Sequence, residues 1–499
     1  MGDVLQSRTD EPGSVEEVLE EWSVFGLAAT VLSGRISAAE VLRICRERVE
    51  AVNPSLNAFV YLDWASAGRA AVAVDSAVSS GAPLGSLAGV PFGVKDTENC
   101  AGMPTRYGSL LYNDVGASET DDVHVARLRA AGAIPIGKTA SPEFMSGLLT
   151  VSHATGVTRN PWNRAISPGG SSGGSGSAVA SGMVPFATGS DGGGSLRIPA
   201  ALCGLIGLKT SFGLVPEARR EPSMVSTTGV LTRTVMDTAG LIDVMQGPIV
   251  SDLMSYAAPD RIRCLVKSVE AMTLRGKRVC YIPSLFGAGI APDVARACRE
   301  AVERLVGREG LVISTLDDDL EFEDDGNDLF LGATAAGKWA MLREEDLAED
   351  RRWLMTDYVR ARLDLSSKVT MSDYARFHGR RLDLAARLHR WFDSVDAVIL
   401  PTVATCDVPA TGPPPTRVGP DGTENNTAVA PFTRLANIAG FPSVSVPVGF
   451  GDNGVPVGVQ VCTALHSDDL ALRIGMAIQR EWSIKLPPAG LYPSRVAPK

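Results

Sequence analysis

Two loops rich in glycine and serine contain the residues of this sequence that are best suited to chemistry. They occupy residues 167–176 and 188–197, and they carry Ser171 and Ser195. A serine hydroxyl can attack a carbonyl carbon or relay a proton, and it can also simply cap a helix. Glycine at this density is costly in a packed element, but it lets backbone N–H groups approach a ligand closely. The two loops therefore predict a site where a hydroxyl attacks and backbone N–H groups stabilise the oxyanion.

Lys95 is a third candidate because it directly follows an apolar run. Residues 87–96 are predicted to form a short buried strand that ends in the charged pair Lys95-Asp96. Ligands of α/β sheets are usually met at the carboxyl ends of strands. A lysine amine has an ordinary pKa near 10.4 and becomes a base at neutral pH only when burial lowers that pKa. Taken alone, however, this segment favours an ion pair between Lys95 and a carboxylate at the strand end.

Residues 169–173 also fit the G-x-S-x-G pattern of a nucleophile elbow. That elbow needs a strand directly before it, and an acid and a histidine further along the chain. Here the preceding residues 160–163 and 167–168 are rich in proline and asparagine, which is typical of loops. Three histidines follow without a distinctive context, namely His378, His389 and His466. A Ser-His-Asp esterase therefore stays open as an alternative that the pattern does not favour.

Residues 132–139 match the residue pattern of a P-loop, but the helix and strand predicted around them do not match a P-loop. A P-loop has a strand before its first glycine and an open loop between the glycines. Here we predict a helix over residues 121–131 before the first glycine, and a strand over residues 133–136 between the glycines. Nucleotide binding is therefore not favoured.

The elements that must position the loops alternate between helices and strands. Ser37 and Glu40 form a capping box at the start of a helix that Asn53-Pro54 is predicted to end. We predict that Ser172, Ser175 and Ser177 cap a helix over residues 175–181. Further helices are predicted over residues 62–79, 293–306, 327–393 and 467–481, and strands over residues 184–188, 278–282, 311–313, 396–402 and a hairpin at 443–447 and 456–461.

Composition restricts the class of protein. The 499 residues are 45% hydrophobic and 21% charged, which is typical of globular proteins, and the net charge of −10 argues against nucleic acid or an anionic membrane as a partner. The N-terminal region lacks a signal-peptide core, and no apolar run is long enough to span a bilayer. Eight scattered cysteines without a CxxC pattern indicate a reducing, cytoplasmic location. The five histidines lack metal-ligand spacing, so we expect no metal and no other cofactor.

The sequence resembles the amidase signature family. Its clearest segments are Gly-Gly-Ser-Ser-Gly-Gly-Ser at residues 169–175 and Gly-Ser-Asp-Gly-Gly-Gly-Ser-Leu-Arg at residues 189–197. The resemblance covers most of the chain and is weak between about 250 and 395. The other segments that carry it are residues 89–96, 137–139, 143–144, 158–163, 198–200, 203–204, 207–209, 400–402, 437 and 440–442.

The resemblance implies a Ser–cis-Ser–Lys triad. Ser195 matches the nucleophile, Lys95 matches the base, and Ser171 matches the relaying serine, whose preceding peptide bond is cis in the family. The implied oxyanion hole consists of the N–H groups of Gly192, Gly193, Gly194 and Ser195. The implied substrate contacts are Phe144, Met145, Ser146 and Gly170, although packing in the core is an equally good interpretation of residues 144–146.

Two positions depart from the family pattern. Gly192 stands where threonine or isoleucine is common, and this could loosen the loop or widen the pocket beside it. Ser190 stands where threonine is usual. Asp191 and Arg197 agree with the pattern, and we interpret them as structural partners of the loop.

The resemblance further implies an α/β fold: a single large domain with a twisted, mixed central β-sheet flanked by helices on both faces. We expect a flexible segment at residues 1–20, the domain at 21–490 and a tail at 491–499. Within the domain we expect the catalytic core at about 85–215. A variable helical region at about 250–395 and the loop at 407–430 would shape the substrate site.

The implied activity is hydrolysis of a carbon–nitrogen bond other than a peptide bond. The substrate would be a small-molecule amide, aryl amide or carbamate (urethane), with esterase side activity, and the protein would be a monomer or homodimer. An alternative with the same fold and triad is a glutamine amidotransferase subunit of a tRNA-dependent complex, which would need a partner protein. A catalytically silent binding scaffold is a further alternative, and an intact triad argues against it.

Overall fold

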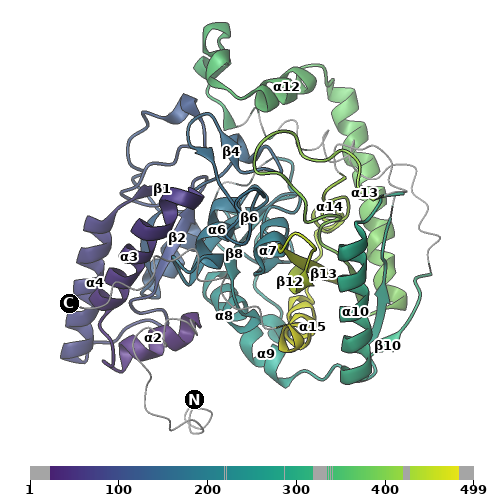
Figure 1. The fold of residues 1–499 in the computed structure, drawn as a ribbon, viewed down its shortest axis with the longest axis horizontal. Coiled ribbons are helices and arrows are strands. Elements are labelled where there is room, and N and C mark those ends of the chain that lie inside the picture. The colour runs from purple at the N-terminus through teal and green to yellow at the C-terminus, as the bar shows by residue number, and fades with distance from the viewer. Residues whose placement is uncertain are drawn as a thin grey trace.

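A mixed β-sheet runs through the middle of the molecule (Figure 1). The computed structural model describes residues 23–482 apart from 219, 221, 286, 318–333, 335, 336, 338, 340 and 420–427, and within these residues the sheet has eleven strands. The predicted flexible segment at 1–20 and the tail at 491–499 lie outside the described residues, as does part of the 407–430 loop.

The strand order is β1-β3-β2-β6-β8-β7-β12-β13-β11-β9-β10. Strands β2, β3 and β6 are parallel neighbours, as are β11, β9 and β10, and the pairs between them are antiparallel. The predicted hairpin is confirmed as β12 and β13. The bounds are β1 Phe59–Leu62, β2 Pro91–Lys95, β3 Ile134–Thr139, β6 Phe186–Asp191, β7 Ile206–Lys209, β8 Thr227–Thr232, β9 Arg278–Tyr281, β10 Val312–Ile313, β11 Ala397–Pro401, β12 Ser443–Phe450 and β13 Pro456–Thr463, with a separate pair β4 Val151–Ser152 and β5 Gly156–Val157.

Five strands of this sheet, β2, β3, β6, β7 and β13, end at one edge. Because β6 and β7 both pair antiparallel with β8, β7 runs in the same direction as β2, β3 and β6. Three fully buried lysines lie at or next to these strand ends, namely Lys95, Lys138 and Lys209. The carboxyl edge of such a sheet is where a site is expected, and the sequence pattern around each lysine is similar.

Helices cover both faces of the sheet, as predicted. Successive side chains of a strand point to opposite faces of the sheet. The apolar residues of one strand are therefore divided between two hydrophobic clusters, one on each face. Val279 and Ile399 belong to the main core, in which the buried side of α10 packs, whereas Cys280 and Val398 pack with the buried residues of α13 and α14. The helices are α2 Val24–Leu32, α3 Ala38–Leu56, α4 Trp64–Ser80, α5 Val123–Ala130, α6 Gly173–Ala180, α7 Arg197–Cys203, α8 Val235–Met245, α9 Leu265–Ala271, α10 Pro292–Glu309, α12 Asp357–Ser366, α13 Met371–Ser394, α14 Arg434–Ala439 and α15 Asp468–Glu481.

The first predicted helix differs from expectation at its end. Ser37 caps α3 by accepting from the N–H of Glu40, but the helix continues through Pro54 to Leu56. A proline removes one N–H and crowds the preceding turn, which matters less in the last turn of a helix. The Asn53 carbonyl still accepts from the N–H of Asn57, and the Asn53 side chain binds the backbone beyond the helix. The prediction that Asn53-Pro54 stops the helix is therefore wrong.

The caps predicted for α6 are also wrong. The helix begins at Gly173 after Ser172, whose side chain makes no capping hydrogen bond. Ser175 Oγ instead donates to the Thr188 carbonyl, and Ser177 Oγ donates to the Arg159 carbonyl. Helix α6 is buried among loops and strands, so these hydroxyls satisfy groups of neighbouring elements rather than the start of their own helix.

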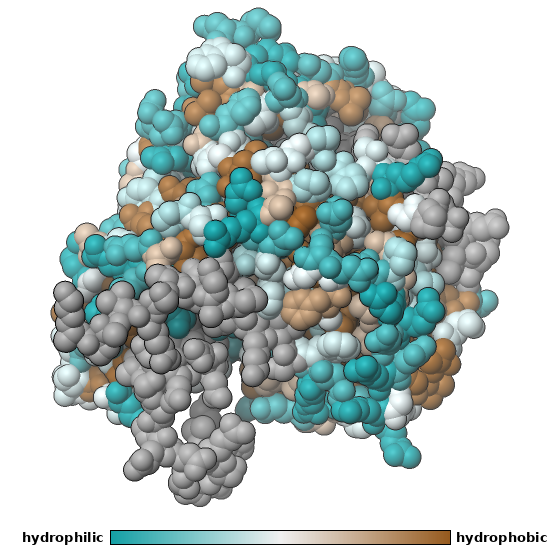
Figure 2. Space-filling view, viewed as in Figure 1, coloured by the Kyte–Doolittle hydropathy of each residue, from teal (hydrophilic) through white to brown (hydrophobic). Residues whose placement is uncertain are grey.

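The long helical region predicted at 327–393 is divided where the structure describes it. Short 3-10 turns at Glu344–Leu347 and Glu349–Leu354 precede α12 and α13. On the face shown in Figure 2, hydrophobic side chains are scattered among polar ones. None of the helices described is both long enough and apolar enough to cross a membrane.

Candidate active site

Lys95 lies at the end of β2 with its amine among three serine hydroxyls. Lys95 Nζ is 2.9 Å from Ser171 Oγ, 2.9 Å from Ser172 Oγ and 3.0 Å from Ser190 Oγ. The lysine is completely buried, and its backbone N–H donates to Thr188 Oγ1. The structure therefore directs this amine to hydroxyls of the two glycine-rich loops, instead of to the carboxylate that its own segment favoured.

The first loop brings Ser171 to this amine through an unusual backbone path. The peptide bond between Gly170 and Ser171 is cis, as the resemblance implied. Directly after it, α6 packs closely against the end of β3: a Cβ at Gly174 would lie 2.2 Å from the backbone N of Ala140. A glycine is needed there because the two backbones leave no room for a side chain.

The second loop is held by a buried ion pair. The Asp191 carboxylate accepts from Arg197 Nε and Nη2 at 2.9 Å each, and both side chains are completely buried. Burial alone would raise the pKa of Asp191, but the Arg197 charge and the hydrogen bonds from Arg197, Asn437 and Gly194 outweigh it and lower this pKa to about 2. Arg197 also donates to Asn437 and Gln460. Asp191 and Arg197 are thus structural partners of the loop.

The same network decides which N–H groups face the cavity. The N–H of Gly194 donates to Asp191 Oδ1 at 2.7 Å, so it is not available to an oxyanion, contrary to the sequence-based expectation. In the part of the chain that is described, no hydrogen bond takes up the N–H of Gly192, Gly193 or Ser195, and all three residues line the cavity. These three N–H groups are the remaining candidates for an oxyanion hole.

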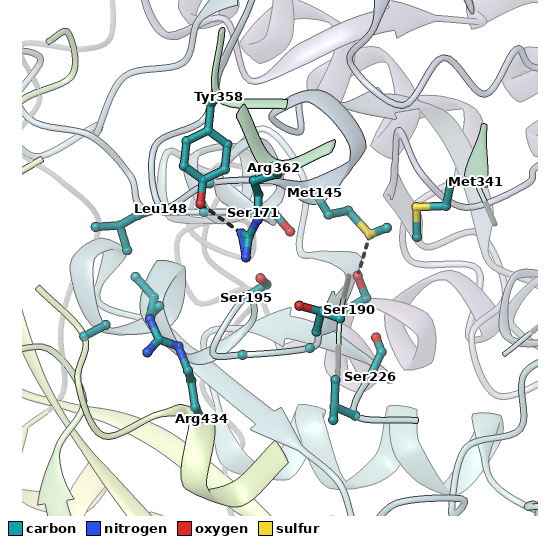
Figure 3. A pocket seen from close by; sticks show the side chains of 18 residues that line it. Met145, Leu148, Ser171, Ser190, Ser195, Ser226, Met341, Tyr358, Arg362 and Arg434 are labelled. Carbon is teal, nitrogen blue, oxygen red and sulfur yellow. Dashed lines mark hydrogen bonds between the residues drawn. The ribbon is translucent and has the colours of Figure 1, made fainter. Parts of the chain in front are cut away.

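A cavity of about 200 Å³ opens above these loops (Figure 3). Ser171, Ser190 and Ser195 lie together at its centre, while no hydrogen bond between Ser195 Oγ and Ser171 Oγ is present among the described contacts. The described residues that line it are Met145, Gly147, Leu148, Gly170, Ser171, Ser190, Gly192, Gly193, Ser195, Ile198, Val225, Ser226, Thr334, Met341, Tyr358, Arg362, Ala430 and Arg434.

Two of the four expected substrate contacts lie on this cavity and two do not. Met145 and Gly170 line it. Phe144 is buried in an apolar cluster with residues of α12, and Ser146 Oγ donates to the Phe144 carbonyl. Phe144 therefore supports the wall from behind, because its ring is needed to pack the element that covers the site.

Helix α12 reaches the cavity through anchors in that wall. The Glu143 carboxylate accepts from the hydroxyl of Ser109 and from both the N–H and the hydroxyl of Thr356, the residue that caps α12. Behind it, Phe144 packs with Val359 and Leu363 of the helix. These contacts place Tyr358 and Arg362 of α12 above the serines (Figure 3).

Several residues of the site were missed in the sequence. Ser172 was assigned to a helix cap and Ser190 was noted only as a departure, yet both contact Lys95. Their position beside Ser171 and Asp191 was the available signal. Tyr358, Arg362 and Arg434 had no local signal, because they enter the site from distant segments.

Histidine and metal chemistry receive no support from the site. None of the described residues that line the cavity is a histidine. In the described portion of the chain, no group of three or more His, Cys, Asp or Glu residues could hold a metal ion. The Gly132 and Gly137 of the P-loop pattern flank residues of a buried strand, with Gly137 inside β3, so this segment is no phosphate-binding loop.

Comparisons with known proteins agree on one family. A family model described as "Amidase" matches residues 40–472. An acylamidase from Rhodococcus erythropolis is 33% identical over 482 residues, which cover 95% of this chain and 98% of the relative. One subunit of the glutamyl-tRNA(Gln) amidotransferase of Acidothermus cellulolyticus is 32% identical over 492 residues, covering 91% of this chain and 93% of the relative.

A solved structure extends this similarity to the fold. A bacterial aryl acylamidase of the amidase signature enzymes superimposes with a TM-score of 0.86 at 27% identity, over 93% of this chain and 96% of that one.

Proposed function

This chain belongs to the amidase family, and on that premise we propose that it hydrolyses the carbon–nitrogen bond of a small-molecule amide, other than a peptide bond, through an acyl-enzyme on Ser195. The observation that carries the proposal is the 2.9 Å contact between Lys95 Nζ and Ser171 Oγ, beside the cavity that Ser195 lines. Amides, aryl amides and carbamates (urethanes) share the required tetrahedral chemistry, and ester hydrolysis is a side activity of the same site.

The proposed reaction starts with the attack of Ser195 Oγ on the amide carbonyl carbon. The proton of Ser195 passes to Ser171 Oγ while Ser171 gives its own proton to Lys95 Nζ. Three hydroxyl neighbours suit both states of the amine, because an ammonium donates three N–H bonds and a neutral amine donates two and accepts one. The proton returns by the same path to the leaving nitrogen, the carbon–nitrogen bond breaks, and water then hydrolyses the acyl-enzyme.

The oxyanion of this reaction would lie at the N–H groups of Gly192, Gly193 and Ser195. Their position at the end of β6 is fixed by the Asp191–Arg197 pair, so the loop does not need to reorganise when charge develops. The proposal requires Ser195 Oγ to move within hydrogen-bond distance of Ser171 Oγ. We expect this movement when substrate binds, because catalytic hydrogen bonds commonly shorten only then.

A serine-directed fluorophosphonate tests the nucleophile. We expect a single adduct on Ser195, located by mass spectrometry, that is absent from Ser195→Ala and weaker in Ser171→Ala. Ser226 lines the same cavity and offers a matched control, since Ser226→Ala should be labelled like the wild type. An adduct on Ser171 or Ser226 would contradict the proposed triad.

The similarity to an amidotransferase subunit supports a second candidate, a glutaminase that acts within a larger complex. It predicts release of ammonia from glutamine and little activity on anilides. Assaying the purified chain with glutamine, a 4-nitroanilide and a carbamate side by side separates the two candidates. We favour the free hydrolase, because the described site is complete without a partner chain.

We also propose a cytoplasmic location and a monomeric or homodimeric state. All eight cysteines are described, and each is a free thiol. Scattered unpaired thiols are typical of a reducing compartment. Sedimentation of the purified chain under reducing conditions measures the oligomeric state.

A further inference from the structure

Two arginine side chains line the cavity, and the proposed catalysis requires neither of them. Arg362 and Arg434 are among the residues that line it, and none of its described lining residues is an aspartate or glutamate. The surrounding chain is acidic, with a net charge of −10. The overall composition therefore does not account for the presence of two guanidinium groups on the wall of one small cavity.

The two arginines reach the site from different parts of the fold. Arg362 projects from α12, and Arg434 is the first residue of α14. In Figure 3 Arg362 enters from above the serines and Arg434 from the lower left, with Leu148 on that side and Met145 and Met341 on the right. The two methionines thus form an apolar side of the cavity across Ser195 from Arg434.

Arg362 is positioned without being neutralised in the described part of the chain. Its Nη1 donates to the hydroxyl of Tyr358 at 3.0 Å, and its guanidinium lies 5.4 Å from the centre of that ring. The acidic residues of the same helix pair elsewhere, Asp357 with Arg360 and Asp364 with Arg352. A neutral phenol orients the guanidinium but leaves its charge for another partner.

We propose that this cavity selects amides that carry a carboxylate, which Arg362 and Arg434 bind while the scissile carbonyl lies at Ser195. Guanidinium groups recognise carboxylates through paired, charge-assisted hydrogen bonds. The apolar side then accepts the uncharged end of the substrate, in contact with Met145 and Met341. This inference rests on the proposed function and specifies its substrate class.

Matched substrates test the selection. We compare the 4-nitroanilides of glutaric and pentanoic acid, which differ mainly by a terminal carboxylate on the acyl side, and N-butanoyl-4-aminobenzoate with N-butanoylaniline, which differ by one on the amine side. The wild type should show higher kcat/KM for one carboxylated member of these pairs. The pair that shows it tells which end of the substrate faces the arginines.

Variants connect this preference to the arginines. Arg362→Gln and Arg434→Gln should each lower kcat/KM for the preferred carboxylate by roughly 10- to 100-fold, as expected for a hydrogen bond to a charged group, and leave the neutral partner substrate nearly unchanged. Arg362→Lys should retain part of the preference. Arg376→Gln, which changes an exposed arginine of α13, is the control and should leave both substrates unchanged. If Arg362→Gln or Arg434→Gln fails to fold, the other variant still tests whether the carboxylate preference depends on an arginine.

The outcomes separate this inference from the proposed function. Efficient cleavage without a carboxylate preference, or equal losses on both substrates of a pair, overturns the inference and keeps the hydrolase. To remove the dependence on turnover, calorimetry on Ser195→Ala measures binding of 5-amino-5-oxopentanoate against pentanamide. Selective binding of the carboxylate, together with no cleavage and no labelling of Ser195 in the wild-type chain, supports the inference and overturns the proposed mechanism.

Discussion

The loops that carry the serines and the segment that covers them are held in place in different ways. We call Lys95 with residues 167–176 and 188–197 the floor, and residues 341–394 the cover. The floor is built into the central sheet, and its key polar groups are buried and bonded to one another. The cover, which includes α12 and α13 in Figure 1, is attached near the cavity by an apolar cluster and by two carboxylates, Glu143 and Asp346.

This difference separates chemistry from selectivity. A change in the floor breaks several buried contacts at once, so its sequence has little freedom. A change in the cover alters which side chains face the cavity and leaves the proposed proton path intact. The resemblance to the family is correspondingly clear in the floor and weak between about 250 and 395, where the cover lies. Substitutions in the two regions should therefore differ in both the kind and the size of their effects.

Replacing Lys95 with methionine should have the largest effect. We expect kcat on an anilide to fall by about a thousandfold, because the floor loses the proposed base, while circular dichroism shows a folded chain. Lys209→Met is a matched control: Lys209 is also completely buried at the same sheet edge, but its amine donates to the Phe441 carbonyl. Burial lowers the pKa of Lys209 to about 7, so this lysine tolerates an uncharged state. A similar loss of kcat in Lys209→Met would contradict the assignment of Lys95.

Asp191→Asn should destabilise the floor by about 3–5 kcal/mol, because it leaves the Arg197 charge buried without its counterion. Chemical denaturation monitored by tryptophan fluorescence measures the change. In the cover, Asp373 pairs with Arg376 at the surface, where solvent screens the pair, and Asp373→Asn should leave the free energy of unfolding nearly unchanged. Equal losses in the two variants would show that the floor is no more constrained than the cover.

Gly194→Ala should cost about 3 kcal/mol and most of the activity. Gly194 has φ +123°, and a Cβ there would lie 2.5 Å from Thr433 Oγ1. Gly192→Ala, two residues earlier, is the comparison, because a Cβ at Gly192 would lie 3.8 Å from the nearest atoms, which belong to the Ser226 side chain. It should leave the thermal midpoint unchanged and reduce activity only on bulky acyl groups. Loss of stability in Gly192→Ala would mean that the whole loop resists substitution.

Acid should unfold the floor in a narrow range of pH. The pKa of Asp191 is lowered to about 2 from an unfolded value near 3.9, so its stabilising effect is fully present above about pH 4 and is lost as the pH falls through about 2. This single group contributes roughly 3 kcal/mol. Denaturation curves between pH 2 and 5 should show the corresponding loss in the wild type and a smaller one in Asp191→Asn. Identical slopes would exclude this carboxyl as a source of acid sensitivity.

Glu143→Gln should have a smaller effect than the changes to Lys95, Asp191 and Gly194, and it should act on the cover alone. The amide cannot accept at both oxygen positions, so the hydrogen bonds to Ser109 and Thr356 are partly lost, at about 1–2 kcal/mol. We expect KM to rise roughly tenfold while kcat is retained, since α12 moves and the floor does not. Steady-state kinetics distinguish this from the opposite result, a lower kcat at constant KM, which would place Glu143 in support of the floor.

The local sequence pattern predicted well those helices and strands whose formation depends mainly on residues within the same segment. The helix that begins after Ser37, the hairpin of β12 and β13, and the buried strand at Lys95 were expected and are present. The strand predicted at 184–188 is present as β6, which begins and ends a few residues later, at Phe186–Asp191. The two failures have different causes. Pro54 was expected to end its helix but lies in the last turn, where a missing N–H matters less. Ser175 was expected to cap a helix but donates to Thr188 of a neighbouring strand.

The sequence by itself determined the class of chemistry, because the glycine and serine loops and their order along the chain carry the family resemblance. The resemblance selected Lys95 as the base, whereas the local residue pattern does not explain why this one of three similar lysines at strand ends serves the loops. Lys138 donates to the Glu98 carbonyl and Thr105, Lys209 donates to Phe441, and Lys95 alone of the three donates to the serine hydroxyls. That choice depends on which loops the sheet order places beside each strand end. The presence of two arginines at the cavity was likewise decided by tertiary structure, because Arg362 and Arg434 meet there only when α12 and α14 pack over the floor.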